Sequence, residues 1–257
     1  MKRGIHPFWG LLEIVAVFGG FQAFNWMVGP RVGEEPILIL FTWLLWFLLG
    51  AYVIWFSPAI LHKMPKQKIG WISFSDGKRA GSFRQSWKMY ASVTLIASAI
   101  LVAHAFSIHS NLIESIQLNG LLIKFGGYIF SGIIQAAIFF GFILIRFKEA
   151  FSHLFSHYSR TVPMVFTIIL TSATFSIFHY PNPELMIITL SAGISWSLVY
   201  YLQPNILLMG FSHAILGTLL HQVVQLHMRI GPFYHNPELY VIREIVPGLK
   251  QLIGNLF

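Results

Sequence analysis

The stretch "FSIFHYPNPELMIITLSAGISWSLVYYLQPNILLMGFSHAILG" (residues 175–217) decides the fold of this chain. Its apolar runs are interrupted twice, by "HYPNP" (179–183) and by "QPN" (203–205). Proline lacks a backbone N–H and disfavours a helical conformation in the residue before it, so each interruption is expected to end a helix. The apolar segments 185–202 and 205–222 are therefore predicted to form a tight helical hairpin.

The composition of the chain places this hairpin in a membrane. Of its 257 residues, 56% are hydrophobic and only 10% are charged, whereas a soluble domain carries about 25% charged residues. The absence of cysteine excludes disulfides, thiolate metal sites and a cysteine nucleophile. The net charge of +8 does not indicate a nucleic-acid partner, because most of the basic residues flank apolar segments. The sequence indicates an integral membrane protein whose main partner is the lipid bilayer.

Apolar segments of similar length recur along the whole chain. Unpaired backbone groups are too costly in lipid for an open sheet, so these segments are expected to cross the membrane as helices. The sequence predicts an all-α fold, a polytopic transmembrane helical bundle of about seven spans, in a single integral membrane domain (1–257). The seven segments are 8–28, 37–61, 89–107, 121–145, 163–180, 185–202 and 205–222.

The charges of the loops predict the orientation. The loop 63–88 carries seven Lys or Arg residues against one Asp, and the positive-inside rule places it in the cytoplasm with Lys2 and Arg3. The N-terminus is then cytoplasmic, and the protein is expected in the cell inner (cytoplasmic) membrane. The segment 146–160 also falls inside, and its apolar residues share one helix face, which predicts a helix lying along the interface. The tail 223–257 is more polar and is expected to be peripheral.

Polar side chains inside the apolar segments are the candidates for function, because burying them in lipid is expensive. His179 follows Phe175 by one helical turn, and His213 shares a helix face with His221. Two histidines on separate helices could meet at one polar centre and hold a water, a divalent metal or a cofactor. The alternative is that each histidine makes a hydrogen bond between helices and has no further role.

The two histidine patterns resemble motifs of the CPBP family of intramembrane metalloproteases, which includes the CAAX prenyl proteases and the Abi proteins. That family is described by a Glu-Glu pair followed by Arg, by FxxxH, and by HxxxN or HxxxD. "FSIFH" supplies Phe175 and His179 for the second motif, and "HAILG" supplies His213 for the third. The resemblance covers about residues 123–222, and it implies a CPBP-like core built from the last four helices.

The resemblance also implies roles for these residues, and the chain departs from them. In the family, a glutamate of the first motif activates water, while the histidines and the Asn bind the reacting carbonyl region. The best match to the first motif here is "QAAIFFGF" (135–142), where Gln135 and Ala136 replace the Glu pair and Phe140 replaces the Arg. The third motif ends in Gly217 instead of Asn or Asp.

Another carboxylate could serve as the base. Glu149 in "FKEAFSH" is the second-best candidate for the first motif, with His153 in the place of the Arg. Glu13, in the first helix, could reach a polar centre, and Glu184 begins the helix after His179. The other six acids are expected in loops or in the tail: Glu34, Glu35, Asp76, Glu114, Glu238 and Glu244.

Three hypotheses follow from these residues. The first is a CPBP-like membrane protein with a degenerate protease site, acting as an accessory or binding subunit of a membrane complex with other membrane protein subunits. The second is an active intramembrane endopeptidase that cleaves a membrane peptide substrate, using His179 and His213 with a relocated Glu. The third is a bis-histidine haem or metal protein. The candidate catalytic residues are His179, His213, Gln135 and Glu149, and the two histidines are the candidate metal ligands.

Overall fold

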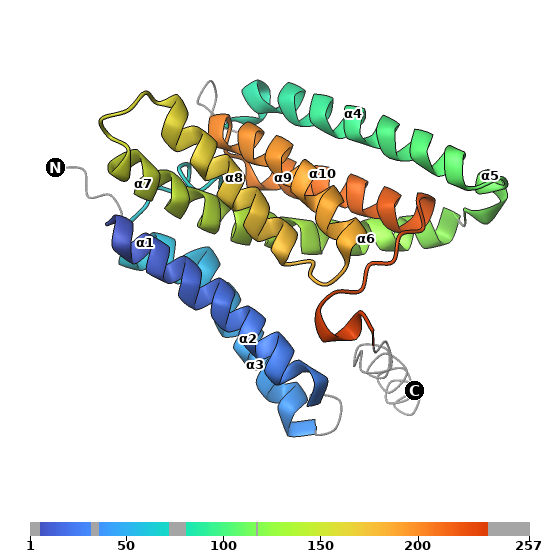
Figure 1. The fold of residues 1–257 in the computed structure, drawn as a ribbon, viewed down its shortest axis with the longest axis horizontal. Helices are drawn as coiled ribbons and strands as arrows, with labels where there is room; N and C mark the ends of the chain where they lie inside the picture. Colours follow the sequence, from blue (N-terminus) through green and yellow to red (C-terminus); the bar gives the residue numbers. More distant parts are fainter. Residues whose placement is uncertain (1–5, 32–35, 72–80, 117, 236–257) are drawn as a thin grey trace.

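A computed structural model describes residues 6–31, 36–71, 81–116 and 118–235. These residues form helices and contain no strand, which confirms the predicted all-α fold (Figure 1). The middle part of the basic loop (72–80) and the end of the tail (236–257) lie outside the described residues.

Each of the seven predicted apolar segments is helical. The first two are continuous helices that include π-helical turns, and the last four follow one another with short connections. The bounds are α1 (Pro7–Ile14), η1 (Val15–Gly19) and α2 (Gly20–Met27); α3 (Pro36–Ala51) and η3 (Tyr52–Leu61); α4 (Phe83–Ile108); α6 (Leu118–Gln135), η4 (Ala136–Leu144) and α7 (Ile145–Leu154); α8 (Thr161–Ile177); α9 (Pro183–Leu202); and α10 (Ile206–Thr218) with η5 (Leu219–Val223).

Six of these helices are long and apolar enough to cross a membrane, and α8 is a shorter apolar helix of 17 residues. At about 1.5 Å per residue, α8 is slightly shorter than the hydrocarbon core of roughly 30 Å. The described residues therefore contain six candidate spans, against the predicted number of about seven, and α8 is the shorter helix at the place of the remaining one. Short turns of helix complete the described chain: η2 (Gly29–Arg31), α5 (Leu112–Ser115) and η6 (Gly231–Phe233).

The expectation of a separate interfacial helix over 146–160 is wrong. α7 continues η4 without a break, so residues 120–154 form one helix of 35 residues. Arg146 and Ala150 are fully buried, and α7 packs against α1 and α8. The apolar face that suggested an interfacial helix instead packs against other helices of the bundle.

Asparagine side chains begin the two helices of the predicted hairpin. Asn182 accepts a hydrogen bond from the backbone N–H of Leu185 at the start of α9, and Asn205 accepts one from Leu208 at the start of α10. Each side chain satisfies a backbone donor that has no partner within its own helix. The short "QPN" turn is therefore present as predicted.

Small residues decide which helices approach most closely. A Cβ atom on Gly210 of α10 would lie 2.6 Å from Ile133 Cγ1 of α6, and a Cβ atom on Gly193 of α9 would lie 3.1 Å from Ser172 Cα of α8. Missing side chains let helix backbones approach within a membrane. The closest packing is consequently between α6 and α10 and between α8 and α9. The prediction of a tight helical hairpin is therefore wrong: the short turn connects α9 to α10, but each of these helices packs mainly against another helix.

Candidate functional site

His179 lies in the turn that connects α8 to α9. Its backbone N–H donates to the carbonyl of Ser176, and its own carbonyl accepts from the N–H of Asn182. The Asn182 side chain donates to the carbonyl of His227, at 2.6 Å, so the chain after α10 crosses this turn. Because the turn is closed by hydrogen bonds on both sides, the imidazole of His179 is held in place; the side chain is 8% exposed.

A single hydrogen bond sets the tautomer of His179. Its Nδ1 lies 2.8 Å from the carbonyl oxygen of Phe175, one helical turn earlier. A carbonyl oxygen only accepts, so Nδ1 carries the proton and donates it. In the neutral ring the other nitrogen, Nε2, then has a free lone pair, and none of the described residues donates to it.

His213 lies on α10, and its ring contacts the ring of Phe175, as the ring of His179 does. The rings of His179 and His213 both stand edge-on to the ring of Phe175, with centroids 5.1 Å and 6.2 Å away. Trp196 of α9 also contacts His213, at 5.5 Å between centroids, and donates through Nε1 to the hydroxyl of Ser212 at 3.0 Å. Neither ring nitrogen of His213 has a hydrogen-bond partner among the described residues.

The two histidines line one cavity of about 420 Å³. Its walls come from α4, α9 and α10, from the end of α8, and from Met228 in the segment that follows α10. The lining is mostly aliphatic, with polar groups supplied by the histidines, Trp196, and hydroxyl residues of α9. None of the described residues that line the cavity is charged. His179 of the FxxxH pattern and His213 of the HA pattern therefore line the same cavity.

The segment 135–142, which is the best match to the family's first motif, packs beside the histidine cavity. Phe139 and Phe140, both buried, contact the ring of Phe175 with centroids 4.9 Å and 6.1 Å away. Gln135 ends α6, just before them, and its buried Oε1 has no hydrogen-bond partner among the described residues. The Gln135 side chain is not among the residues that line the cavity.

The structure places Glu149 and Glu184 outside the lining of the histidine cavity. Glu149, on α7, forms an ion pair with Lys68 at 2.6 Å between Oε1 and Nζ. Glu184 is exposed in the first turn of α9. Neither lines the cavity. Of the other acids, Glu114 is exposed on the short α5, while Glu34, Glu35, Asp76, Glu238 and Glu244 lie outside the described residues.

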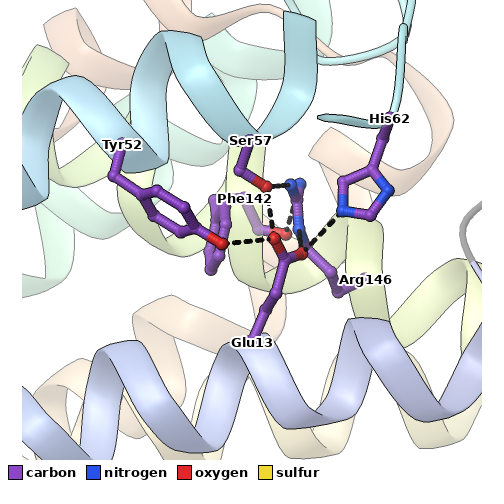
Figure 2. Close-up of polar contacts among 6 residues, drawn as sticks. All are labelled: Glu13, Tyr52, Ser57, His62, Phe142 and Arg146. Carbon is purple, nitrogen blue, oxygen red and sulfur yellow. Dashed lines mark hydrogen bonds and ion pairs between the residues drawn. The ribbon is translucent and has the colours of Figure 1, made fainter. Parts of the chain in front are cut away.

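Glu13 does reach a polar centre, but a different one. Figure 2 shows its carboxylate pointing from α1 toward η3, where Tyr52 and Ser57 donate to Oε1 at 2.7 Å and 2.6 Å. His62 Nε2 lies 3.1 Å from Oε2, and Arg146 Nε donates to the same oxygen at 3.2 Å. Both carboxylate oxygens are therefore engaged.

Arg146 is the centre of this cluster and was missed as a functional candidate. Its side chain is fully buried; it also donates to Ser57 Oγ at 2.7 Å and lies 3.8 Å from the ring centroid of Phe142. The available signal was a cation inside the apolar run "FGFILIRF" (140–147), since such residues are rare in spans and pair with one another. We call the side chains of Glu13, Tyr52, Ser57, His62 and Arg146 the Glu13 cluster.

The residues around the cavity do not fit a divalent metal held by the protein. Zinc sites take four ligands in structural centres and three protein ligands in catalytic ones. The cavity offers two imidazoles, and the described residues contain no group of three or more His, Asp or Glu side chains placed to hold a metal.

A comparison with protein families finds a match in the part of the chain that contains both histidines. A family model described as type II CAAX prenyl endopeptidase Rce1-like matches residues 117–219. The matched part runs from α6 to the end of α10 and contains Gln135, His179 and His213. This match confirms the resemblance that the sequence motifs indicated. No curated protein and no solved structure matches the chain.

The Glu13 cluster makes a prediction about stability. Replacing Glu13 by Leu leaves the buried Arg146 charge without its partner, and breaking such a pair typically costs about 3–5 kcal/mol. We expect a clear fall in the thermal unfolding temperature of the detergent-purified Glu13→Leu variant, and partial recovery in the double variant Glu13→Leu/Arg146→Met. The matched control is Lys68→Ala, which breaks a more exposed pair and should cost about 1 kcal/mol or less. Equal effects of Glu13→Leu and Lys68→Ala would contradict this account of the cluster.

Proposed function

We propose that this membrane protein of the CPBP family has a degenerate protease site and acts as a binding or accessory subunit of a membrane complex. The observation that supports the proposal is the environment of the two histidines. Both imidazoles open on an apolar cavity, and none of the described carboxylates lines it. The retained part of the site can hold a ligand by hydrogen bonds, but no described carboxylate lines the cavity with the imidazoles to serve as the family's base.

The energetics support a non-catalytic role. The amide of Gln135 cannot accept a proton at neutral pH, and loss of a general base typically lowers a rate by a factor of about 10² to 10⁴. Two carboxylates that could replace it are held in ion pairs, Glu13 with Arg146 and Glu149 with Lys68. The third, Glu184, is exposed in the first turn of α9 and does not line the cavity. Recruiting Glu13 to the histidines would leave the fully buried Arg146 unpaired. The alternative of an active endopeptidase with a relocated Glu therefore carries a large energetic cost for Glu13, and for Glu149 or Glu184 it requires a side chain that does not line the cavity to enter it.

The aromatic packing at Phe140 supports the same proposal. This residue stands where the family pattern has Arg, and it contacts the rings of Phe175, Trp196 and Tyr200. A guanidinium in that place would be buried among aromatic rings without a carboxylate to neutralise it. The two replacements fit together. Without the Glu pair a buried Arg would have no acidic partner, whereas Phe140 packs well against the aromatic rings around it.

A cleavage assay tests the proposal. The purified chain in lipid nanodiscs is incubated with membrane-embedded and prenylated peptides, next to an active CPBP endopeptidase as positive control. We expect no cleavage above background by the wild type, His179→Ala or His213→Ala. The matched control is His221→Ala, since His221 binds Tyr128 outside the cavity. Cleavage that is lost in His179→Ala and His213→Ala but kept in His221→Ala would refute the proposal.

We further propose the orientation with the N-terminus and the basic loop in the cytoplasm of a cell with an inner membrane. Contacts of the described loop residues support a common side: Lys68 binds Glu149 at the α7 end, and the carbonyl of Gly70 accepts from Ile206 at the start of α10. In Figure 1 the N-terminal end of α1 and the α7–α8 connection lie at the same end of the bundle.

Cysteine labelling tests this orientation, since the natural chain has no cysteine. A membrane-impermeant maleimide should label Lys66→Cys and His157→Cys in inside-out vesicles and leave them unlabelled in right-side-out vesicles. Asn111→Cys, in the α4–α5 connection, should show the opposite pattern; all three positions are exposed. Labelling of Lys66→Cys from outside would overturn the orientation.

A further inference from the structure

The cavity that holds the histidines opens toward the lipid-facing surface of the bundle. Ile96 and Ile100 of α4 and Ile187 of α9 line it, and each of the three is more than 60% exposed. Both helices are candidate membrane spans, so their exposed side chains face the bilayer. A molecule dissolved in the membrane can therefore reach the cavity sideways, between α4 and α9.

The lining restricts the charge of such a molecule. None of the described residues that form the cavity is Asp, Glu, Lys or Arg. A charged head group brought there would lose its hydration without meeting an opposite charge, which is strongly unfavourable. The long aliphatic wall, with Val93, Leu101 and Ile188, instead suits an apolar chain. The volume of about 420 Å³ lies in the range of roughly 300–1,000 Å³ that small-molecule pockets occupy.

The imidazoles restrict the head group further. Nε2 of His179 can only accept a hydrogen bond, because Nδ1 donates to Phe175. A neutral His213 has one N–H donor and one acceptor, neither of which has a partner among the described residues. A hydroxyl group satisfies both rings at once, since it donates to His179 and accepts from His213. An ether or ester oxygen cannot donate, and would leave Nε2 of His179 unsatisfied.

We propose that the cavity binds a neutral single-chain lipid with a hydroxyl head, such as a long-chain alcohol or a monoacylglycerol, taken from the bilayer between α4 and α9. The hydroxyl lies between His179 and His213, and the chain lies along the aliphatic wall. This inference rests on the proposed non-proteolytic function and specifies the class of ligand. No bond is made or broken in the step, so the histidines act as a recognition pair.

Photo-crosslinking in phosphatidylcholine nanodiscs tests the inference. The probe is hexadecanol carrying a diazirine in its chain, and mass spectrometry maps the labelled residues. We expect labelling concentrated at 93–101 and 187–196, the segments of α4 and α9 that line the cavity on either side of the proposed lipid entry. Dodecanol should compete with the probe at least tenfold better than dodecyl methyl ether, because the ether lacks the donor for His179. Labelling spread evenly over all exposed helices, or equal competition by alcohol and ether, would overturn the inference.

Two variants connect the discrimination to the histidine. His179→Phe keeps an aromatic ring but removes the acceptor, so alcohol and ether should compete equally. His221→Phe changes a histidine outside the cavity and should keep the tenfold preference. Ala97→Phe fills the cavity from α4 and should reduce labelling of 187–196 at least tenfold. Retained preference in a folded His179→Phe variant would contradict the assigned role.

The same nanodiscs separate this inference from the function on which it rests. Peptide cleavage that depends on His179 refutes the proposed function whatever the probe shows. Absence of cavity labelling in a sample that cleaves no peptide refutes the lipid ligand alone. Labelling of the cavity with preference for the alcohol, in a sample without cleavage, supports both.

Discussion

The fully buried guanidinium of Arg146 is the constraint on which the rest of the structure depends. A charge in an apolar interior must be neutralised and hydrogen-bonded, and Glu13 meets that need. The pair joins the first helix to the long helix 120–154, and Tyr52, Ser57 and His62 connect the second helix to it. A carboxylate that the sequence left available as a base is thereby used to hold three spans together.

The long helix contributes to two chemically different regions, the charged Glu13 cluster and the apolar surroundings of the histidine cavity. Toward its C-terminal end it carries Arg146, while Phe139 and Phe140 pack against Phe175 beside the cavity. In the proposed alignment with the family's first motif, Phe140 of these aromatic contacts stands in the place of the Arg. The two imidazoles line a cavity without a charged residue among those that the structure describes. The proposed function and the proposed hydroxyl ligand both rest on this arrangement.

Much of the fold could be predicted from the sequence, because length and hydropathy define membrane helices almost independently of their partners. The sequence left the meeting of His179 and His213 as one of two alternatives, and the structure brings both to one cavity, with His179 just before α9 and His213 within α10. Arg146 could not be placed by local pattern, because its partner Glu13 is 133 residues away. The position of the segment after α10 could not be predicted either. Its backbone carbonyls accept hydrogen bonds from Asn182, and every residue type has such a carbonyl.

The claim that the histidine cavity has lost its base is tested most directly by an experimental structure of the full chain in lipid nanodiscs at a resolution that defines side chains. The account predicts that no carboxylate of the chain, including Glu34, Glu35, Asp76, Glu238 and Glu244, lies within about 4 Å of either imidazole. It also predicts that Glu13 remains bound to Arg146. A glutamate or aspartate hydrogen-bonded to a water between His179 and His213 would contradict it.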